Sequence, residues 1–273
     1  MQNLWQHLIP YLVVSFIYIA VALDFWRSAK TIEKPQLLKL HPSIIALGLA
    51  LHGWILYRDI FAVSNFNFGI YYALSAIFWL TALIYWLADL KYQLQSLQAF
   101  ILPLAGIFVL LPAFTIKNYF LPEAMSPLFV AHIGIALLAY SLFTFAALHA
   151  LLMALAERNL HNKPTLITFP NFPPLLVMED LLFKVIKVAF VLLTFTLISG
   201  MFFSEQIFGK PLTFTHKIVF SIASWLIYGW LLYGRFKFGW RGRKAINLTL
   251  IGFALLLLAY VVSKFILQVL LNR

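Results

Sequence analysis

The sequence predicts an all-α membrane protein, a polytopic bundle of about eight transmembrane helices. Of the 273 residues, 63% are hydrophobic and 11% are charged, whereas soluble domains carry about 25% charged residues. Apolar runs of about 20 residues, long enough to cross a bilayer, begin near Leu8, Pro42, Phe68, Phe100, Leu128, Phe183, His216 and Asn247. We therefore expect a single membrane domain over residues 1–273.

Prolines make two segments irregular. Pro103 and Pro112 bracket the fourth apolar run, so we expect this helix to be tilted, kinked or extended by the amphipathic stretch before it. The prolines between the fifth and sixth runs exclude a continuous helix before about Pro174. From Pro174 we expect a short interfacial helix that leads into the sixth span.

Lys and Arg gather in alternate connections, which predicts the orientation of the chain because short cytoplasmic loops carry the excess of positive charge. The first, fifth and seventh connections are the basic ones, with Arg27, Lys30, Lys34 and Lys39, with Arg158 and Lys163, and with Arg235, Lys237, Arg241, Arg243 and Lys244. We expect these connections in the cytoplasm. Both termini are therefore expected on the outer, periplasmic side.

The composition argues against several classes of function. Cysteine is absent, so the chain has no thiol for disulfide chemistry and no thiolate ligand for zinc or an iron–sulfur cluster. The net charge of +11 comes from basic connections that act as topology signals, and we expect no nucleic-acid site. The sequence has no nucleophile elbow, phosphate loop, HExxH motif or carboxylate pair, so no catalytic residue is predicted.

Three histidines lie near the outer face in this topology. His52 falls in the outer half of the second span, His132 about one turn into the fifth span, and His216 at the outer start of the seventh. Imidazole is the usual axial ligand of haem iron, so haem is one candidate cofactor. His149 lies about 26 Å deeper than His132 along the same helix, so the two cannot share a ligand. Whether His149 and His41 form a second, cytoplasmic-side site stays open.

Aromatic and basic residues surround these histidines in the sequence. A porphyrin needs apolar contacts and its propionates need cations; the candidates are Phe202, Phe203, Phe208 and Phe214, Trp54 and Tyr57, and Lys210, Lys217 and Arg58. The alternative interpretation is structural. A membrane histidine often bonds a neighbouring helix, interfacial aromatic residues anchor helices, and Lys217 reaches to the surface.

Other charged residues are weaker signals. Four carboxylates at the predicted cytoplasmic ends of spans are expected to be solvated end caps: Asp24, Asp89, Glu157 and Asp180. Glu205 lies just outside the sixth span and is a candidate partner of a cation or of Lys217. Lys264 lies deep in the eighth span and requires either a partner or a side chain that extends outward.

The second half of the chain, residues 125–270, carries a family resemblance. Gly200 is expected near the end of a helix, Trp225 and Tyr228 follow in an aromatic-rich helix, and the sequence GWRGR stands at 239–243. The segment VAHIGIALLAYSLFTFAALHALL places His132 at the start of another helix. This frame resembles the cytochrome c assembly family typified by CcsA. The resemblance implies a bacterial inner-membrane protein that handles haem in cytochrome c biogenesis.

The outer loop before His216 departs from that family. Where the family has a tryptophan-rich WGxxWxWD core, this chain has FGKPLTFTH, with Phe208 and Phe214 among the replacements and Thr215 in place of the Asp. The outer-side His that the family carries after this loop is missing from the end of the eighth span. The pattern is similar to the YpjD and HemX-like branch. It implies haem handling without a complete haem-presenting loop.

These observations lead to one principal hypothesis and two rivals. We expect a haem-binding membrane protein in which His132 and His216 are the axial ligands of the iron, His52 is the alternate, and Phe208, Phe214 and Trp54 line the site. Its expected partners are haem, other cytochrome c maturation or haem-pathway proteins, and membrane lipid. A small-solute or ion transporter would instead use Lys264, Glu205 and the fourth helix. A haem-free regulatory scaffold would use the basic turn from Arg235 to Lys244 to dock a soluble partner or anionic lipid.

Overall fold

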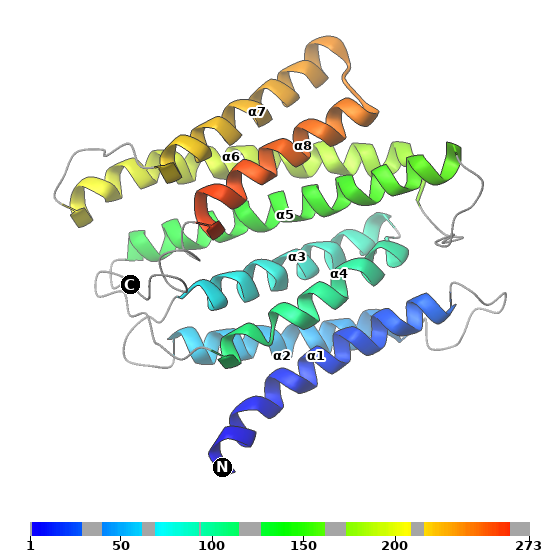
Figure 1. The fold of residues 1–273 in the computed structure, drawn as a ribbon, viewed down its shortest axis with the longest axis vertical. Helices are drawn as coiled ribbons and strands as arrows, with labels where there is room; N and C mark the ends of the chain where they lie inside the picture. Colours follow the sequence, from blue (N-terminus) through cyan, green and yellow to red (C-terminus); the bar gives the residue numbers. More distant parts are fainter. Residues whose placement is uncertain are drawn as a thin grey trace. The chain divides into compact units, whose positions relative to one another are not determined.

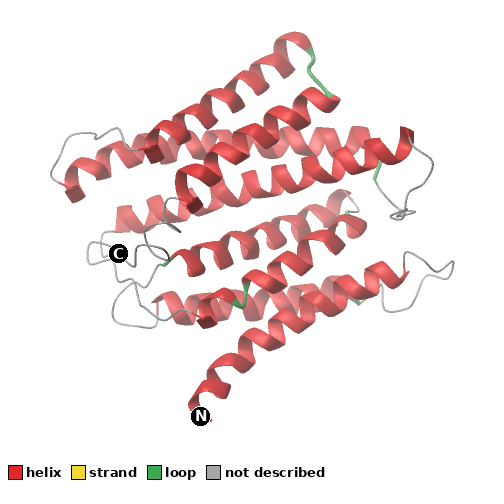
Figure 2. Cartoon of the chain, viewed as in Figure 1, coloured by secondary structure: helices red, strands yellow, loops and turns green. Residues whose placement is uncertain are grey.

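The computed structural model describes residues 2–28, 40–61, 69–92, 94–114, 127–161, 173–208 and 216–262. Every element in these ranges is helical (Figure 2), so the predicted all-α class is confirmed. The elements are α1 (Gln2–Ser28), α2 (His41–Phe61), α3 (Ile70–Tyr92), α4 (Gln95–Phe108), η2 (Leu111–Phe114), α5 (Pro127–His161), α6 (Leu175–Phe208), α7 (His216–Phe238), α8 (Gly242–Leu257) and the π-helical turn η3 (Leu258–Val262) (Figure 1).

The described residues form eight segments that are long and apolar enough to cross a membrane, which confirms the predicted number of spans. They begin at Leu8, His41, Ile70, Leu97, Pro127, Leu175, His216 and Gly242. An even number of spans predicts that the start of α1 and the end of α8 lie on one side of the membrane. That this side is the outer one stays a prediction from the Lys and Arg asymmetry.

Two prolines account for the irregular shape of the fourth span. Helix α4 begins at Gln95, so it includes the stretch before the apolar run, as expected. Pro103 lies inside the helix, and Pro112 lies in the short 3-10 helix η2 that follows. Proline lacks the N–H that an α-helical turn requires, and the second proline coincides with the change of helix type.

Two spans begin earlier than predicted. Helix α6 starts at Leu175, directly after Pro174, and runs without a break to Phe208, so the expected interfacial helix is the first part of this helix. Helix α8 starts at Gly242 instead of Asn247, and its first turn includes Arg243 and Lys244. In both places charged residues lie within the helix, where hydropathy alone predicts a connection.

The chain divides into two compact units. Unit 1 comprises residues 1–120 and 156–174, and unit 2 comprises residues 121–155 and 175–273. Helices α1 to α4 belong to unit 1, whereas α6, α7, α8 and most of α5 belong to unit 2. The single membrane domain stays a prediction.

Close helix contacts hold unit 1 together. A Cβ on Gly48 of α2 would lie 3.0 Å from the ring of Tyr18 on α1, so glycine permits the close approach of these two helices. Helix α3 is tied to α2 by two indole donors. Trp79 Nε1 donates to the carbonyl of Leu49 at 2.8 Å, and Trp86 Nε1 donates to that of Pro42 at 2.9 Å.

The core of unit 2 is centred on Tyr228 of α7, which is fully buried. Its ring stacks on Phe143 of α5, and its hydroxyl donates to the carbonyl of Thr249 on α8 at 3.0 Å. A Cβ on Gly252 would lie 2.8 Å from the Tyr228 ring. Successive helices of this unit run in opposite directions, so the start of α5, the end of α6 and the start of α7 lie at one end of it (Figure 1).

Candidate functional site

His132 lies in the second turn of α5 and is half-buried. Its Nδ1 is 2.7 Å from Ser199 Oγ on α6, and Ser199 Oγ is 2.6 Å from the carbonyl oxygen of Phe195. A carbonyl can only accept, so the Ser199 hydroxyl donates to Phe195 and accepts from the Nδ1–H of His132. In the neutral ring this leaves Nε2 as the nitrogen with the lone pair. Nε2 is therefore the atom through which His132 can bind a metal.

Among the described residues, apolar groups also lie close to His132. A Cβ on Gly200 would lie 3.5 Å from Cε1 of the ring, and the Phe129 ring is stacked with the imidazole at a centroid distance of 6.4 Å. Leu128 and Phe202, at the ends of the same two helices, are 71% and 70% exposed. Exposed apolar side chains at the end of a membrane unit can face lipid or an apolar ligand such as a porphyrin.

His216 is the first residue of α7 and is exposed. Because α5 and α7 begin at the same end of unit 2, the structure places His132 and His216 at that end (Figure 1). Lys217, the candidate partner of a propionate, is half-buried beside it. Axial ligation by the two histidines stays a prediction.

His52 belongs to unit 1 and is fully buried. Its Nε2 is 2.9 Å from Ser75 Oγ, and its Nδ1 is 3.4 Å from the Tyr18 hydroxyl. Both ring nitrogens thus lie beside hydroxyl groups inside the four-helix unit. Ligation of iron by His52 would break at least one of these contacts, so the observed environment is that of a structural histidine.

Trp54 and Arg58 lie in the C-terminal half of α2, which is predicted to be the outer one. The Trp54 side chain is 57% exposed, and the Arg58 guanidinium lies 5.5 Å from the centre of its ring. Arg58 Nε also donates to Asp59 Oδ1 at 2.8 Å, and Asp59 accepts from the hydroxyl of Tyr11. Arg58 is thus paired through Nε with Asp59, a carboxylate that was not predicted from the sequence. A contact between Arg58 and a propionate stays a prediction.

Several candidate side chains lie outside the described residues. Phe214, Lys210 and Lys264 belong to segments that the structure does not describe. Phe208 is the last residue of α6, and its side chain, like those of Phe203 and Glu205, is not described. A cover of Phe208 and Phe214 over the site therefore stays a prediction.

The histidines on the predicted cytoplasmic side have structural partners. His149 is fully buried, and its Nε2–H donates to the carbonyl of Met178 on α6 at 3.0 Å. His41 is also buried, with Nε2 2.8 Å from Asp24 Oδ2, while its Nδ1 has no partner among the described residues. Asp24 is thus paired with a buried imidazole, whereas Asp180 is exposed as expected of an end cap.

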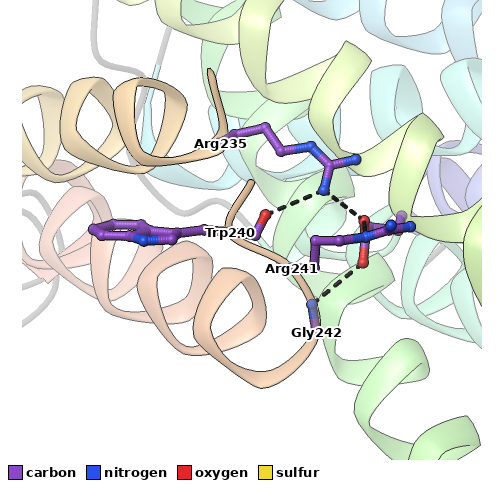
Figure 3. Close-up of polar contacts among 5 residues, drawn as sticks. Arg235, Trp240, Arg241 and Gly242 are labelled. Carbon is purple, nitrogen blue, oxygen red and sulfur yellow. Dashed lines mark hydrogen bonds and ion pairs between the residues drawn. The ribbon is translucent and has the colours of Figure 1, made fainter. Parts of the chain in front are cut away.

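Glu179 of α6, a carboxylate that was not predicted from the sequence, has a side chain that is 8% exposed. Its Oε1 accepts from Arg235 Nη1 at 2.8 Å and from Arg241 Nε at 2.7 Å, and its Oε2 accepts from the N–H of Gly242 at 3.2 Å (Figure 3). Arg235 Nη1 also donates to the carbonyl of Trp240 at 3.2 Å. Glu179 therefore fastens the turn between α7 and α8 to α6.

Among the described residues, no group of three or more His, Cys, Asp or Glu side chains is arranged to hold a metal ion. This finding does not bear on haem, because a porphyrin supplies four ligands and the protein only one or two.

Comparison with known proteins identifies the family. The model of the family described as cytochrome C assembly protein matches residues 40–271, most of the chain and part of both units. The chain belongs to the cytochrome c assembly protein family. The match begins well before residues 125–270, which carry the resemblance in the sequence. The helices of unit 1 from α2 onward therefore belong to the family as well.

Curated relatives place the chain within the family. It is 33% identical over 172 residues to the inner membrane protein YpjD of Escherichia coli strain K12, covering 62% of this chain and 64% of that protein. An uncharacterised protein of Azospirillum brasilense is 36% identical over 142 residues, 52% of each chain. The cytochrome c biogenesis protein CcsA of Prochlorococcus marinus strain SARG is 30% identical over 89 residues, 33% of this chain and 28% of that one. No solved structure matches.

These findings confirm the predicted YpjD-like branch of the cytochrome c assembly family. The protein has eight membrane-spanning helices among its described residues and is similar to an inner membrane protein. Both findings indicate a multi-pass protein of a bacterial inner membrane. The match to YpjD covers 64% of the length of that relative, which is less than two thirds.

The residues that carry the family resemblance take part in the packing of unit 2. Tyr228 is the centre of its core, and Gly200 lies against the His132 ring. Trp225 Nε1 donates to Thr194 Oγ1 at 2.8 Å, which ties α7 to α6. Trp240 and Arg241 of the GWRGR sequence belong to the turn that Glu179 fastens. In this chain these residues thus contribute to the packing of α5, α6, α7 and α8.

Proposed function

We propose that this protein binds haem at the predicted outer end of unit 2 and acts in cytochrome c biogenesis or in control of the haem pathway. The observation that carries the proposal is the hydrogen bond from His132 to Ser199, which holds the imidazole in the tautomer that presents Nε2. Histidines that bind metals usually donate their other N–H to such an orienting acceptor. The similarity to relatives named for cytochrome c biogenesis supports a role in that process.

In this proposal His132 is one axial ligand of the haem iron and His216 is the other. Two neutral imidazoles would give a six-coordinate, low-spin iron, and a haem so bound supplies a redox-active centre. The residues of the chain would orient the ring and exclude water. Ser199 fixes the imidazole, Gly200 leaves space against it, and Phe202 offers an apolar surface at the end of α6.

A structural role for the same hydrogen bond is the alternative. Interhelical bonds from His to Ser also hold membrane helices together without any ligand, with a contribution of about 0.6 kcal/mol each. Such a role would leave His216 exposed and unused at the start of α7. The two interpretations differ in whether the purified protein carries a chromophore.

The decisive experiment is the visible spectrum of the protein purified in detergent from haem-replete cells. We expect a Soret band that elutes with the polypeptide and low-spin features in the reduced-minus-oxidised spectrum. A preparation that is folded, as shown by a cooperative melting curve, but has no Soret band and takes up no added haem would contradict the proposal. The expected partners, other cytochrome c maturation or haem-pathway proteins, would then need separate evidence.

A further inference from the structure

The turn between α7 and α8, residues 235–244, concentrates positive charge. It carries five cations, namely Arg235, Lys237, Arg241, Arg243 and Lys244. Glu179 is the carboxylate that accepts hydrogen bonds from two of them, Arg235 and Arg241. A single carboxylate balances a single cation, so most of the positive charge of this turn is not compensated by it.

Glu179 also makes the turn rigid. Gly239 and Gly242 adopt positive φ angles of 65° and 55°, a conformation that glycine tolerates, and the N–H of Gly242 is bound by Glu179. Arg235 holds the carbonyl of Trp240 from the other side (Figure 3). Cations on a fixed backbone lose less conformational entropy on binding a ligand than cations on a flexible loop.

The remaining cationic groups are exposed. Lys237, Arg243 and Lys244 are all exposed, and Lys244 Nζ lies 3.4 Å from the centre of the Trp240 ring. Arg241 is 53% exposed, and its hydrogen bond to Glu179 uses Nε, so this bond leaves the two Nη groups of the guanidinium to other partners. A guanidinium end of this kind forms paired hydrogen bonds with phosphate oxygens.

Large aromatic side chains stand beside these cations at the end of α7. Phe236 is 90% exposed and Phe238 is 60% exposed, and Trp230 and Tyr233 are each about half exposed one to two turns earlier. Aromatic rings mixed with Lys and Arg at the end of a membrane span are typical of the headgroup region.

We propose that a basic–aromatic surface, made of Phe236, Lys237, Phe238, Arg241, Arg243 and Lys244, binds the headgroup phosphates of anionic phospholipids. The cations match the charge of the phosphates, and the phenyl rings enter the boundary between headgroups and acyl chains. Glu179 and Arg235 hold the backbone of the turn, and Glu179 also binds Arg241 through its Nε. This binding site is independent of haem.

The test measures how phosphatidylglycerol changes the apparent unfolding temperature of the full-length protein in detergent, against phosphatidylcholine at the same concentrations. We expect phosphatidylglycerol alone to raise it. The triple variant Lys237→Gln, Arg243→Gln, Lys244→Gln leaves the Glu179 contacts intact. Each cation near an anionic membrane surface contributes roughly fivefold in affinity. In the triple variant, the phosphatidylglycerol concentration that gives half of the rise in unfolding temperature should therefore increase at least about tenfold.

A matched control removes the same charges elsewhere on the predicted cytoplasmic side: Lys91→Gln, Arg158→Gln, Lys184→Gln. This variant should respond to phosphatidylglycerol as the wild type does. Equal loss in both triple variants would show that net charge alone attracts the lipid and would overturn the proposal. So would a wild-type response in the turn variant, or equal responses to the two lipids. If glycerol phosphate or an acidic peptide reproduces the rise in place of lipid, the occupant is a free anion or a soluble protein, and the lipid site is wrong.

Discussion

The hydroxyl of Ser199 accepts the Nδ1–H of His132 across the α5–α6 contact, with 2.7 Å between the two atoms. If His132 binds iron, Ser199 is a positioning residue, because it selects the tautomer and the angle of the ring. Loss of such an orienting partner typically costs 10- to 100-fold in metal affinity. Ser199→Ala should therefore weaken haem binding by about that factor and broaden the Soret band, measured by haem titration of the purified protein.

Thr196→Val is a suitable control for that prediction. Thr196 lies one turn before Ser199 on α6, and its hydroxyl donates to the carbonyl of Leu192 on its own helix. Its loss removes a hydroxyl without touching His132, so haem affinity should stay unchanged. Equal weakening in the two variants would mean that the hydroxyl acts through helix packing.

The second prediction concerns the three candidate ligands. His132→Ala and His216→Ala should each lose the bound haem or convert it from low spin to high spin, because each removes one axial imidazole. His149→Gln should leave the spectrum unchanged, since its amide can still donate to the Met178 carbonyl. If both Ala variants keep the haem content and spectrum of the wild type, the ligand pair is wrong.

His52→Ala separates the alternate ligand from a structural role. The His52 ring is buried between Ser75 and Tyr18, and its removal leaves their hydroxyls without this partner. An unsatisfied buried polar group costs about 1–3 kcal/mol, so the apparent unfolding temperature should fall while the haem spectrum stays that of the wild type. A normal unfolding temperature with an altered spectrum would instead favour His52 as the ligand.

Hydropathy was sufficient to predict the number of spans, because each apolar run of about 20 residues has one stable placement in a bilayer. It misplaced the starts of α6 and α8 for a common reason. Glu179 lies within the first turns of α6, and Arg241 and Gly242 precede or begin α8. All three precede the predicted starts of these spans near Phe183 and Asn247, whereas their mutual hydrogen bonds satisfy them at the ends of the helices.

The same limit applies to the candidate site. The sequence indicated His132, but it could not indicate Ser199, because the register between α5 and α6 depends on contacts between residues far apart in the chain. The nearest signal was Gly200, since small residues mark close helix contacts in membranes. Glu179 had no local signal at all, and its partners Arg235 and Arg241 lie in a different helix and a different turn.

The third prediction tests the Glu179 contacts. Glu179→Gln keeps the shape of the side chain but removes the charge that binds two guanidinium groups. Breaking a buried ion pair by removing one partner costs about 3–5 kcal/mol, and the partial exposure of both arginines reduces the expected loss to about 2–3 kcal/mol. Asp180→Asn, an exposed neighbour paired with Lys184, should cost about 0.5 kcal/mol or less. Denaturant unfolding in detergent micelles measures both losses of free energy. Similar losses from the two variants would show that the contacts of Glu179 contribute no more than a surface ion pair.

The fourth prediction concerns two glycines of unit 2. A Cβ on Gly252 would lie 2.8 Å from the buried Tyr228 ring, so Gly252→Ala must displace the centre of the core. Overpacking of this kind costs about 1–3 kcal/mol. Gly134 of α5 has nothing within 4 Å of the added Cβ, so Gly134→Ala should be neutral or stabilise the helix by up to about 1 kcal/mol. The opposite order of unfolding temperatures would contradict the packing of α7 on α8.

The last prediction is that both termini lie on the outer side of the membrane. The basic connections are the first, fifth and seventh, and an excess of Lys and Arg marks cytoplasmic loops. Because the native chain has no cysteine, single cysteines at Asn3, Gln36, Lys210 and Arg243 can each be labelled without background. In intact cells a membrane-impermeant maleimide should label the variants at Asn3 and Lys210, whereas Gln36 and Arg243 should react only after the membrane is permeabilised. Labelling of Gln36 or Arg243 in intact cells would invert the topology. The end of unit 2 with His132 and His216 would then face the cytoplasm, and the basic–aromatic surface would face the outer leaflet.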